Sequence, residues 1–268
     1  MHPDMGAMNT DEDIIRINVG NGIVKIILNR PRKKNAVTEK MYINLGNILH
    51  ELSKDESVHM VVITGAGDFF TSGNDFMDTF NVNENSELHG KSPLESKLAS
   101  IKIFIDALIT FPKLLVALVN GPAIGIGATM LGLFDIVYAS DKAYFYTPFS
   151  KLGLVAEGCS TYTFPKILGP SKAGHMLYFD YKMGAKEAKE YGLVSEVYKD
   201  AGEVWTYLER LNQLSIESIM ATKRLVRKWN EETLLEVNKA ELEELKKRSE
   251  SSDLAERISH VILNKSKL

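Results

Sequence analysis

Residues 116–129 read VALVNGPAIGIGAT, and this one segment combines a strand, a turn and the start of a helix. The run Leu114–Val119 is apolar throughout and rich in β-branched side chains, which predicts a buried strand. Asn120-Gly121-Pro122 then gives a strong turn signal, and the small residues of Gly125–Thr129 suit the first turn of a buried helix. A sharp strand-to-helix turn leaves backbone N–H groups unpaired, and these can bind a phosphate or a reaction oxyanion, or can stay without a ligand.

A second segment, Met60–Asp75, has the same design, since a short buried strand over Met60–Thr64 runs into glycine-bearing turns. Gly65-Ala66-Gly67 supplies the first half of the GxGxxG dinucleotide fingerprint. Phe70 stands where the last glycine belongs, which argues against a Rossmann site. Strands dominate the first half of the chain in a repeated strand–strand–helix order, and helices dominate the second half. We therefore expect an α/β fold built as a β/α superhelix of stacked ββα turns.

The remaining pattern supports this order. Turn residues at 20–22 join two alternating segments into a hairpin, and Thr38 is a candidate N-cap for the helix that follows. The other expected elements are the hairpin strands Asp13–Val19 and Val24–Leu28, a helix over Leu94–Ile109, strands Ile136–Ala139 and Ala143–Tyr146, a helix over Ser160–Leu168, a short strand within Leu193–Tyr198, and helices from about Ile216 to Lys265.

Composition excludes several classes. The chain has 268 residues, of which 44% are hydrophobic and 25% charged, as in soluble globular proteins. The formal charge of −3 gives no support to nucleic-acid binding, and no apolar run is long enough for membrane insertion. One cysteine, Cys159, permits no intramolecular disulfide framework and fits a reducing compartment. The histidines form no HxxH or HExxH pattern, so we expect no metal.

The two ends of the chain carry separate expectations. Residues 1–12 have no basic or apolar signal region, and we expect a flexible leader there. The core is expected over 13–200, and 201–265 form a helical C-terminal part of the same domain. The chain ends in Ser266-Lys267-Leu268, which matches the peroxisomal targeting tripeptide. The alternative is a polar tail that matches the pattern by chance.

Four segments together make the chain recognisable, because they occur in a fixed order. They are Asn29-Arg30-Pro31 with Asn35-Ala36, Phe70–Asp75, Asn120–Gly125, and Phe134–Ala139. Over about Asp13–Arg257 the chain resembles the crotonase (enoyl-CoA hydratase/isomerase) superfamily. The resemblance implies a crotonase-like catalytic domain that binds acyl-CoA, needs no cofactor beyond the CoA of its substrate, and forms trimers or dimers of trimers through its helical C-terminal region.

The resemblance also implies an oxyanion hole. In that family the thioester oxygen lies between the backbone N–H groups of the residues that follow the glycine in each loop. Here these residues are Asn74, after Gly73, and Ile126, after Gly125. Preorganised donors ease removal of the proton next to a thioester, because they stabilise the enolate oxygen that forms. Since the donors are backbone groups, we expect the side chains at these positions to matter less.

Members of the family differ in where their carboxylates stand. A hydratase uses two glutamates, one to activate water and one to deliver a proton. The corresponding positions here hold Thr129 and Phe149. Both carboxylates are missing, so hydration by the usual mechanism is not expected.

One carboxylate remains. Glu157 lies between the apolar segment Leu154–Ala156 and Gly158. Taken alone, this position favours an ordinary acid at the start of a helix, where the dipole stabilises it. The segment Thr147–Gly153 followed by Glu157-Gly158 is similar to the enoyl-CoA delta isomerases, especially the peroxisomal type 2 group, although Ala156 stands where proline often does. The resemblance implies that Glu157 is the sole acid/base, and its apolar setting is expected to raise its pKa.

One carboxylate suffices for moving a double bond from C3 to C2, because the proton taken from C2 is returned to C4 on the same face. Dienoyl-CoA isomerisation, thioester hydrolysis and a catalytically silent acyl-CoA-binding member are the alternatives. A silent member would bind acyl-CoA without converting it. Peroxisomal β-oxidation in the matrix, with an import receptor as partner, fits the C-terminal tripeptide. The acyl length preference depends in part on the loop Asn81–Ser92.

The resemblance places a basic loop near the CoA nucleotide, so Lys33 or Lys34 is expected to meet its phosphates, with Lys223 on a late helix as a further candidate. The expected substrate-contacting set is completed by Ser72, Gly73, Asp75, Gly125 and Phe149. Asp75 is better suited to bracing its loop than to reacting. Cys159 has no histidine at nucleophile-partner spacing, so a packing role is expected.

Overall fold

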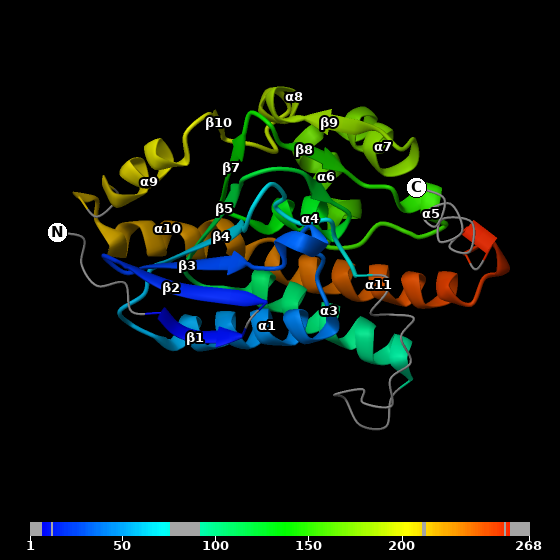
Figure 1. Ribbon diagram of the computed structural model, residues 1–268, viewed down its shortest axis with the longest axis horizontal. Helices are drawn as coiled ribbons and strands as arrows, with labels where there is room; N and C mark the ends of the chain where they lie inside the picture. Colours follow the sequence, from blue (N-terminus) through cyan, green and yellow to red (C-terminus); the bar gives the residue numbers. More distant parts are fainter. Residues whose placement is uncertain (1–6, 12, 76–91, 211–212, 255, 258–268) are drawn as a thin grey trace.

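A computed structural model of the chain describes residues 7–11, 13–75, 92–210, 213–254 and 256–257. A seven-stranded sheet runs through it in the order β1-β2-β3-β4-β5-β7-β10, and a second sheet has the order β6-β8-β9 (Figure 1). The strands of the larger sheet are β1 Ala7–Asp11, β2 Ile14–Gly20, β3 Ile23–Leu28, β4 Met60–Gly65, β5 Leu114–Val119, β7 Ile136–Ser140 and β10 Glu196–Tyr198. The smaller sheet contains β6 Ala123–Ile124, β8 Tyr144–Tyr146 and β9 Lys182–Gly184.

Successive turns of the chain stack on one another. From β3 onward, each strand of the larger sheet pairs in parallel with the next one along the chain. After β5 the chain adds β6 to the smaller sheet, and after β7 it adds β8. The loop after β4 joins the smaller sheet in the same way, because Thr71 forms a parallel bridge with Ala123 of β6. This confirms the expected superhelix of ββα turns.

Helices cover the sheets and complete the domain. The long ones are α1 Glu39–Lys54, α3 Pro93–Thr110, α10 Ile216–Lys228 and α11 Glu231–Ser249. The shorter ones are η1 Pro31–Lys33, α4 Ile126–Thr129, η2 Met130–Leu133, α5 Phe149–Leu152, α6 Ser160–Leu168, α7 Pro170–Tyr178, α8 Ala185–Glu190 and α9 Ala201–Arg210. The α1 helix packs on α3, and α3 packs on α11. Thr38 caps α1 as predicted, because its side chain accepts a hydrogen bond from the Met41 backbone N–H.

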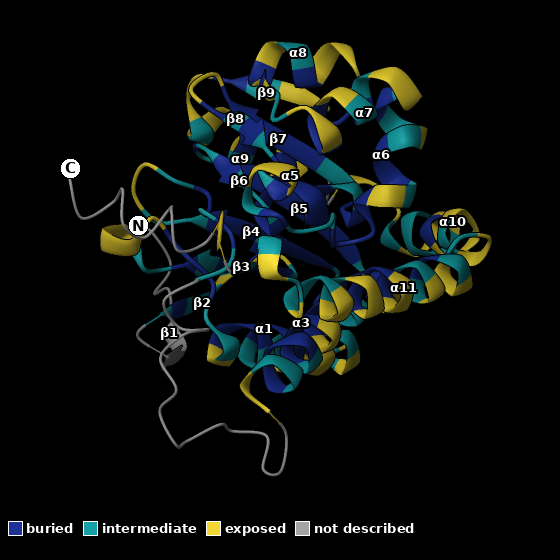
Figure 2. Ribbon diagram, turned by 90° about the vertical axis from the view of Figure 1, so that its right-hand side faces the viewer, coloured by how far each residue is buried: buried dark blue, intermediate teal, exposed yellow. Residues whose placement is uncertain are grey.

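Two apolar clusters explain why the central strands are apolar throughout. In β4, Val61 and Ile63 contribute to the larger cluster, whereas Met60 and Val62 contribute to the smaller one. Successive strand residues point to opposite faces, so a sheet buried on both faces needs apolar side chains at every position. Figure 2 shows β5 and β7 at this buried centre.

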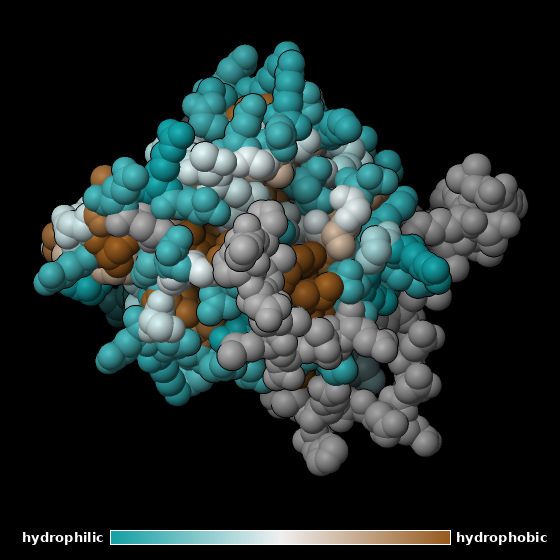
Figure 3. Space-filling view, turned by 60° about the vertical axis from the view of Figure 1, so that its left-hand side comes forward, coloured by the Kyte–Doolittle hydropathy of each residue, from teal (hydrophilic) through white to brown (hydrophobic). Residues whose placement is uncertain are grey.

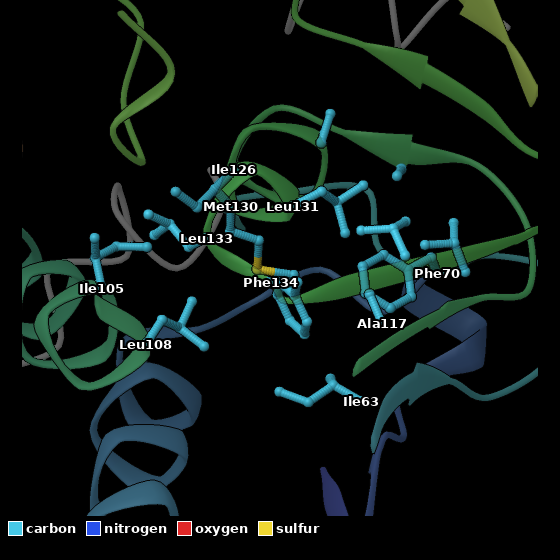
Figure 4. Packing of buried hydrophobic residues seen from close by; sticks show 14 of the residues in the cluster. Ile63, Phe70, Ile105, Leu108, Ala117, Ile126, Met130, Leu131, Leu133 and Phe134 are labelled. Atoms are coloured by element: carbon cyan, nitrogen blue, oxygen red, sulfur yellow. The ribbon is translucent and has the colours of Figure 1, made fainter. Parts of the chain in front are cut away.

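The larger cluster also fixes the short helices that follow β5. Figure 4 shows Met130 and Leu133, which directly follow α4, beside Ile105 and Leu108 of α3. All four side chains are buried, at 3% exposed or less. The η2 helix that follows α4 is therefore packed against α3.

The expectation for the start of the chain was wrong in part. Ala7–Asp11 do not belong to a flexible leader, because they form β1 and pair antiparallel with β2. The short polar segment gave no strong strand pattern, and its pairing depends on the exposed edge that β2 offers. Residues 1–6, residue 12, the C-terminal tripeptide 266–268 and most of the loop 81–92 lie outside the described residues.

Candidate active site

The two glycine-bearing loops lie directly against each other. Gly73 has φ +86° and Gly125 has φ +58°, in the region that favours glycine. A Cβ on Gly73 would lie 2.7 Å from the carbonyl oxygen of Ile124 and 3.6 Å from Cα of Gly125. Glycine is thus required at residue 73 by both its conformation and the close approach of the second loop.

Backbone hydrogen bonds hold the two loops together. Two backbone N–H groups at the contact take no part in them. Ile124 N–H donates to the Thr71 carbonyl oxygen at 3.0 Å, and Gly125 N–H donates to the Tyr146 carbonyl oxygen at 2.8 Å. Ile126 is the first residue of α4, so its N–H group has no place in the helical ladder. Within the described part of the chain, neither this N–H group nor that of Asn74 has a hydrogen-bond acceptor.

Glu157 lies beside these loops and is buried, at 3% exposed. The Asn74 side-chain Nδ2 donates to Glu157 Oε1 at 2.8 Å, and the Tyr42 hydroxyl donates to Asn74 Oδ1 at 2.7 Å. Glu157 Oε2 has no hydrogen-bond partner among the described residues. One carboxylate oxygen is therefore held while the other is left for a ligand.

The surroundings favour the protonated form of this carboxylate. Burial raises the pKa of Glu157 to about 7, and the charge of Glu241 acts in the same direction, whereas Lys97 and the hydrogen bond from Asn74 oppose the shift. This confirms the predicted direction. A pKa near neutrality suits a group that must both accept and return a proton.

A buried lysine lies close to Tyr42 and acts on the charge of Glu157. Lys97 of α3 is 5% exposed, its Nζ donates to the Val37 carbonyl oxygen at 3.4 Å, and it lies 5.2 Å from the centre of the Tyr42 ring. Burial and the negative charge of Glu157 raise the pKa of Tyr42 well above its usual value. Tyr42 therefore stays protonated and remains a donor to Asn74.

At the two positions where a hydratase has glutamates, this chain has buried side chains that carry no charge. Thr129 is fully buried and Phe149 is 4% exposed. A Cβ on Gly158 would lie 2.7 Å from Thr129 Oγ1 and 2.9 Å from Ile126 Cδ1. The turn that carries Glu157 therefore packs directly on Thr129.

The basic loop lies at the edge of the first glycine-bearing loop. Lys33 and Lys34 are exposed, and the Lys34 carbonyl oxygen accepts a hydrogen bond from Ser72 N–H at 2.9 Å. Lys34 Nζ lies 5.2 Å from the centre of the Phe69 ring. The structure thus brings Lys33, Lys34 and Ser72 together.

Two further charged residues have structural partners. Asp75 Oδ2 accepts a hydrogen bond from Arg30 Nη1 at 2.9 Å, which braces the loop as expected. Lys223 is buried, and its Nζ donates to Asp135 Oδ2 at 2.7 Å. The expectation that Lys223 contacts the CoA phosphates was wrong, because this ion pair instead fastens α10 to the start of β7.

Sequence reasoning missed the roles of three side chains. It treated the Asn74 side chain as incidental, whereas this amide holds the candidate base. It also passed over Lys97 and Glu241, which lie on helices far from Glu157 in the sequence. The only available signal was a polar side chain at position 74, where a backbone group alone would serve.

Other kinds of site find no support in the described part of the chain. No three His, Cys, Asp or Glu side chains in it lie together in a way that could hold a metal ion. None of its helices is both long and apolar enough to cross a membrane. Cys159 is buried, its Sγ donates to the Leu234 carbonyl oxygen at 3.4 Å, and burial raises the pKa of its thiol. These contacts fit the expected packing role.

Comparison with known proteins gives one family. A family described as enoyl-CoA hydratase/isomerase matches residues 18–260. The chain is 40% identical to "Enoyl-CoA delta isomerase 3, peroxisomal" of Mus musculus, over 99% of this chain and 84% of the relative. It is 40% identical to "Enoyl-CoA delta isomerase 2" of Homo sapiens, over 100% of this chain and 68% of the relative. For the protein of the same name in Rattus norvegicus the identity is 44%, over 95% and 64%.

Solved structures have the same fold. An enoyl-CoA hydratase/isomerase from Pseudoalteromonas atlantica superposes with a TM-score of 0.85 at 30% identity, over 94% of this chain and 97% of that one. OdaA from Pseudomonas aeruginosa gives a TM-score of 0.83 at 31% identity, over 94% and 99%.

Proposed function

Because the chain belongs to the enoyl-CoA hydratase/isomerase family, we propose that it is an enoyl-CoA delta isomerase that converts 3-enoyl-CoA to trans-2-enoyl-CoA in fatty-acid β-oxidation. The observation that carries this proposal is the state of Glu157: one oxygen is held by Asn74, and the other is buried without a partner. Thr129 and Phe149 stand at the two positions where a hydratase has carboxylates. Isomerisation needs one acid/base group, and the site offers one.

In the first step, Glu157 Oε2 takes a proton from C2 of the substrate. The electrons of the C2–H bond move toward the thioester carbonyl, and a dienolate forms that extends over the former C3–C4 double bond. The backbone N–H groups of Asn74 and Ile126 donate to the thioester oxygen as it gains negative charge. Each preorganised donor of this kind typically contributes about 3 kcal/mol to transition-state stabilisation.

In the second step, protonated Glu157 returns its proton to C4, and the double bond now lies between C2 and C3. No atom is gained or lost, and the carboxylate is regenerated. Because one carboxyl group serves both carbons, both transfers occur on the same face. A pKa of about 7 leaves much of the carboxylate form available at neutral pH and makes its protonated form a competent acid.

The CoA part of the substrate is proposed to lie at the basic loop. The exposed Lys33 and Lys34 adjoin Ser72 in the first oxyanion loop, and ammonium groups at this place attract phosphates. Replacement of Lys33 and Lys34 by alanine is expected to raise KM for the CoA thioester about 10-fold at low salt and to leave kcat within twofold. An unchanged KM would remove these lysines from the CoA site.

Two observations support a proposal for assembly and location. Leu225, Val226 and Trp229, on α10 and at its end, are 63–76% exposed, and Figure 3 shows apolar patches on this side of the surface. Exposed apolar groups of this kind favour association, and we propose a homotrimer or a dimer of trimers. The terminal Ser266-Lys267-Leu268 and the relative named peroxisomal support the peroxisomal matrix.

Turnover of a 3-enoyl-CoA tests the function. Purified protein is incubated with the substrate, and formation of the conjugated 2-enoyl thioester is followed by its absorbance. We expect conversion by the wild type and loss of about 10³-fold or more in kcat for Glu157→Gln, with retained acyl-CoA binding in calorimetry. Binding by the wild type without conversion would instead select a silent acyl-CoA-binding protein.

A further inference from the structure

The turn that follows Glu157 has a strained backbone. Gly158 has φ +70° and Cys159 has φ +62°. Both angles lie in the left-handed region, which is uncommon for residues other than glycine. Such a conformation persists where the surroundings hold it in place, and it often occurs at functional sites. The contacts of Cys159 therefore bear on how Glu157 is positioned.

Glu241 of α11 makes these contacts. Its Oε2 accepts a hydrogen bond from Cys159 N–H at 2.7 Å. Its Oε1 accepts from the backbone N–H of Thr161 at 2.9 Å and from the Thr161 hydroxyl at 2.6 Å. Bonds to an ionised carboxylate are among the stronger hydrogen bonds in proteins. Both carboxylate oxygens thus bind one turn, which begins two residues after the candidate base.

Burying the charged carboxylate of Glu241 would destabilise the fold if these hydrogen bonds were not made. It is 5% exposed, and burial raises the pKa of Glu241, while its bonds to Thr161 and Cys159 oppose the rise. The bonded N–H groups belong to the start of α6, where a helix has unpaired donors and favours a negative charge. Glu241 supplies that charge from a helix some 80 residues further along the chain.

We propose that Glu241 is a positioning residue for the proton transfer, which holds the Glu157–Thr161 turn and so directs Glu157 Oε2 at the substrate. The proposal rests on the proposed function, because it assigns a role in the reaction to a group that does not touch the substrate. It links one residue of α11 to the position of Glu157, although no residue of α11 belongs to either glycine-bearing loop.

The charge of Glu241 has a second effect that separates this role from a purely structural one. Among the described residues, the side chains that shift the pKa of Glu157 are Asn74 from the first loop, Lys97 from α3 and Glu241 from α11, and Tyr42 from α1 bonds to Asn74. The negative charge of Glu241 raises the pKa of Glu157. Its removal lowers the pKa of Glu157, so the acid limb of the pH–rate profile moves to lower pH.

The test is the isosteric variant Glu241→Gln in the full-length protein. We expect kcat to fall about 10- to 100-fold, KM to stay within twofold, and the acid limb of kcat to move to lower pH. Glu243→Gln is the matched control, because Glu243 lies on the same helix with a 63% exposed side chain. An unchanged kcat and pH profile in Glu241→Gln would overturn the proposal.

A second measurement does not depend on turnover. Hydrogen exchange followed by mass spectrometry reports on the amides of Cys159 and Thr161, and we expect the peptide over residues 156–164 to exchange faster in Glu241→Gln but not in Glu243→Gln. If Glu241→Gln exchanges faster but the wild type converts no 3-enoyl-CoA, the proposed function is refuted, while the contact between Glu241 and the turn is supported. Unchanged exchange would overturn the positioning role, whatever the wild-type activity.

Discussion

The Asn74 side chain donates to Glu157 Oε1 at 2.8 Å, and the backbone N–H of the same Asn74 is one of the two proposed oxyanion donors. One residue thus links the proposed base to the proposed oxyanion hole. The Tyr42 hydroxyl, which donates to Asn74 Oδ1 at 2.7 Å, fixes which end of the amide faces Glu157. The amide nitrogen must face the carboxylate, because its oxygen already accepts from Tyr42.

Replacement of Asn74 by alanine separates these two roles, since the backbone donor remains. We expect kcat to fall about 10- to 100-fold. The hydrogen bond from Asn74 lowers the pKa of Glu157, so the acid limb of the pH–rate profile is expected to move to higher pH. This is opposite to the shift expected for Glu241→Gln. A profile that stays in place would show that the amide does not act on the carboxylate.

Glu157→Gln is expected to change the pH dependence of stability. The pKa of Glu157 is raised from 4.5 to about 7 in the folded protein, so the folded state binds more protons than the unfolded state between these values. Wild-type stability therefore falls as pH rises through this window. Relative to the variant, we expect the wild type to lose about 2–3 kcal/mol between pH 5 and pH 8, measured by urea unfolding at both pH values. Parallel curves would contradict the assignment.

Gly73→Ala tests the contact between the two oxyanion loops. The new Cβ would lie 2.7 Å from the Ile124 carbonyl oxygen at φ +86°, so the loops must separate and the oxyanion donors shift. We expect a fall of at least about 100-fold in kcat/KM. Gly184→Ala is the control, because nothing lies within 4 Å of the Cβ position there. Equal activity of the two variants would argue against a close-packed hole.

Thr129→Glu restores a carboxylate where a hydratase has one, yet we expect no hydratase activity from it. Thr129 is fully buried, and Gly158 packs on its hydroxyl. The larger charged side chain must displace the turn that carries Glu157 or remain buried without a partner. We expect a loss of about 3 kcal/mol or more in stability, measured by thermal unfolding. Measurable hydration of a 2-enoyl-CoA would show that the site adapts more readily.

Much of the fold could be predicted, because local patterns specify it. The apolar run of Leu114–Val119 defines β5, and Ser160–Leu168 was predicted with the same bounds as α6. β1 was missed, since its short polar segment becomes a strand only through pairing with β2. Local propensity gives no sign of such a partner.

The candidate site was predicted only where a motif carries it. Asn74, Ile126 and Glu157 were predicted because their loops resemble those of a known family, and the structure brings them together. Lys97 and Glu241 reach Glu157 from helices that are distant in the chain, and their charged side chains are typical of a solvated helix face. Their burial arises from how α3 and α11 pack, which a single sequence does not encode in any short pattern.

The proposed oxyanion donors are main-chain atoms next to Gly73 and Gly125, so substitutions at positions 74 and 126 that preserve the backbone cannot delete them. The proton-transfer group, in contrast, is one side chain that a single base change can abolish. A lineage that loses Glu157 would therefore keep a site able to polarise a thioester. In such a scaffold the thioester-binding part of the site resists mutation, whereas the proton-transfer group can change. A new reaction can then arise when a single carboxylate moves to another position.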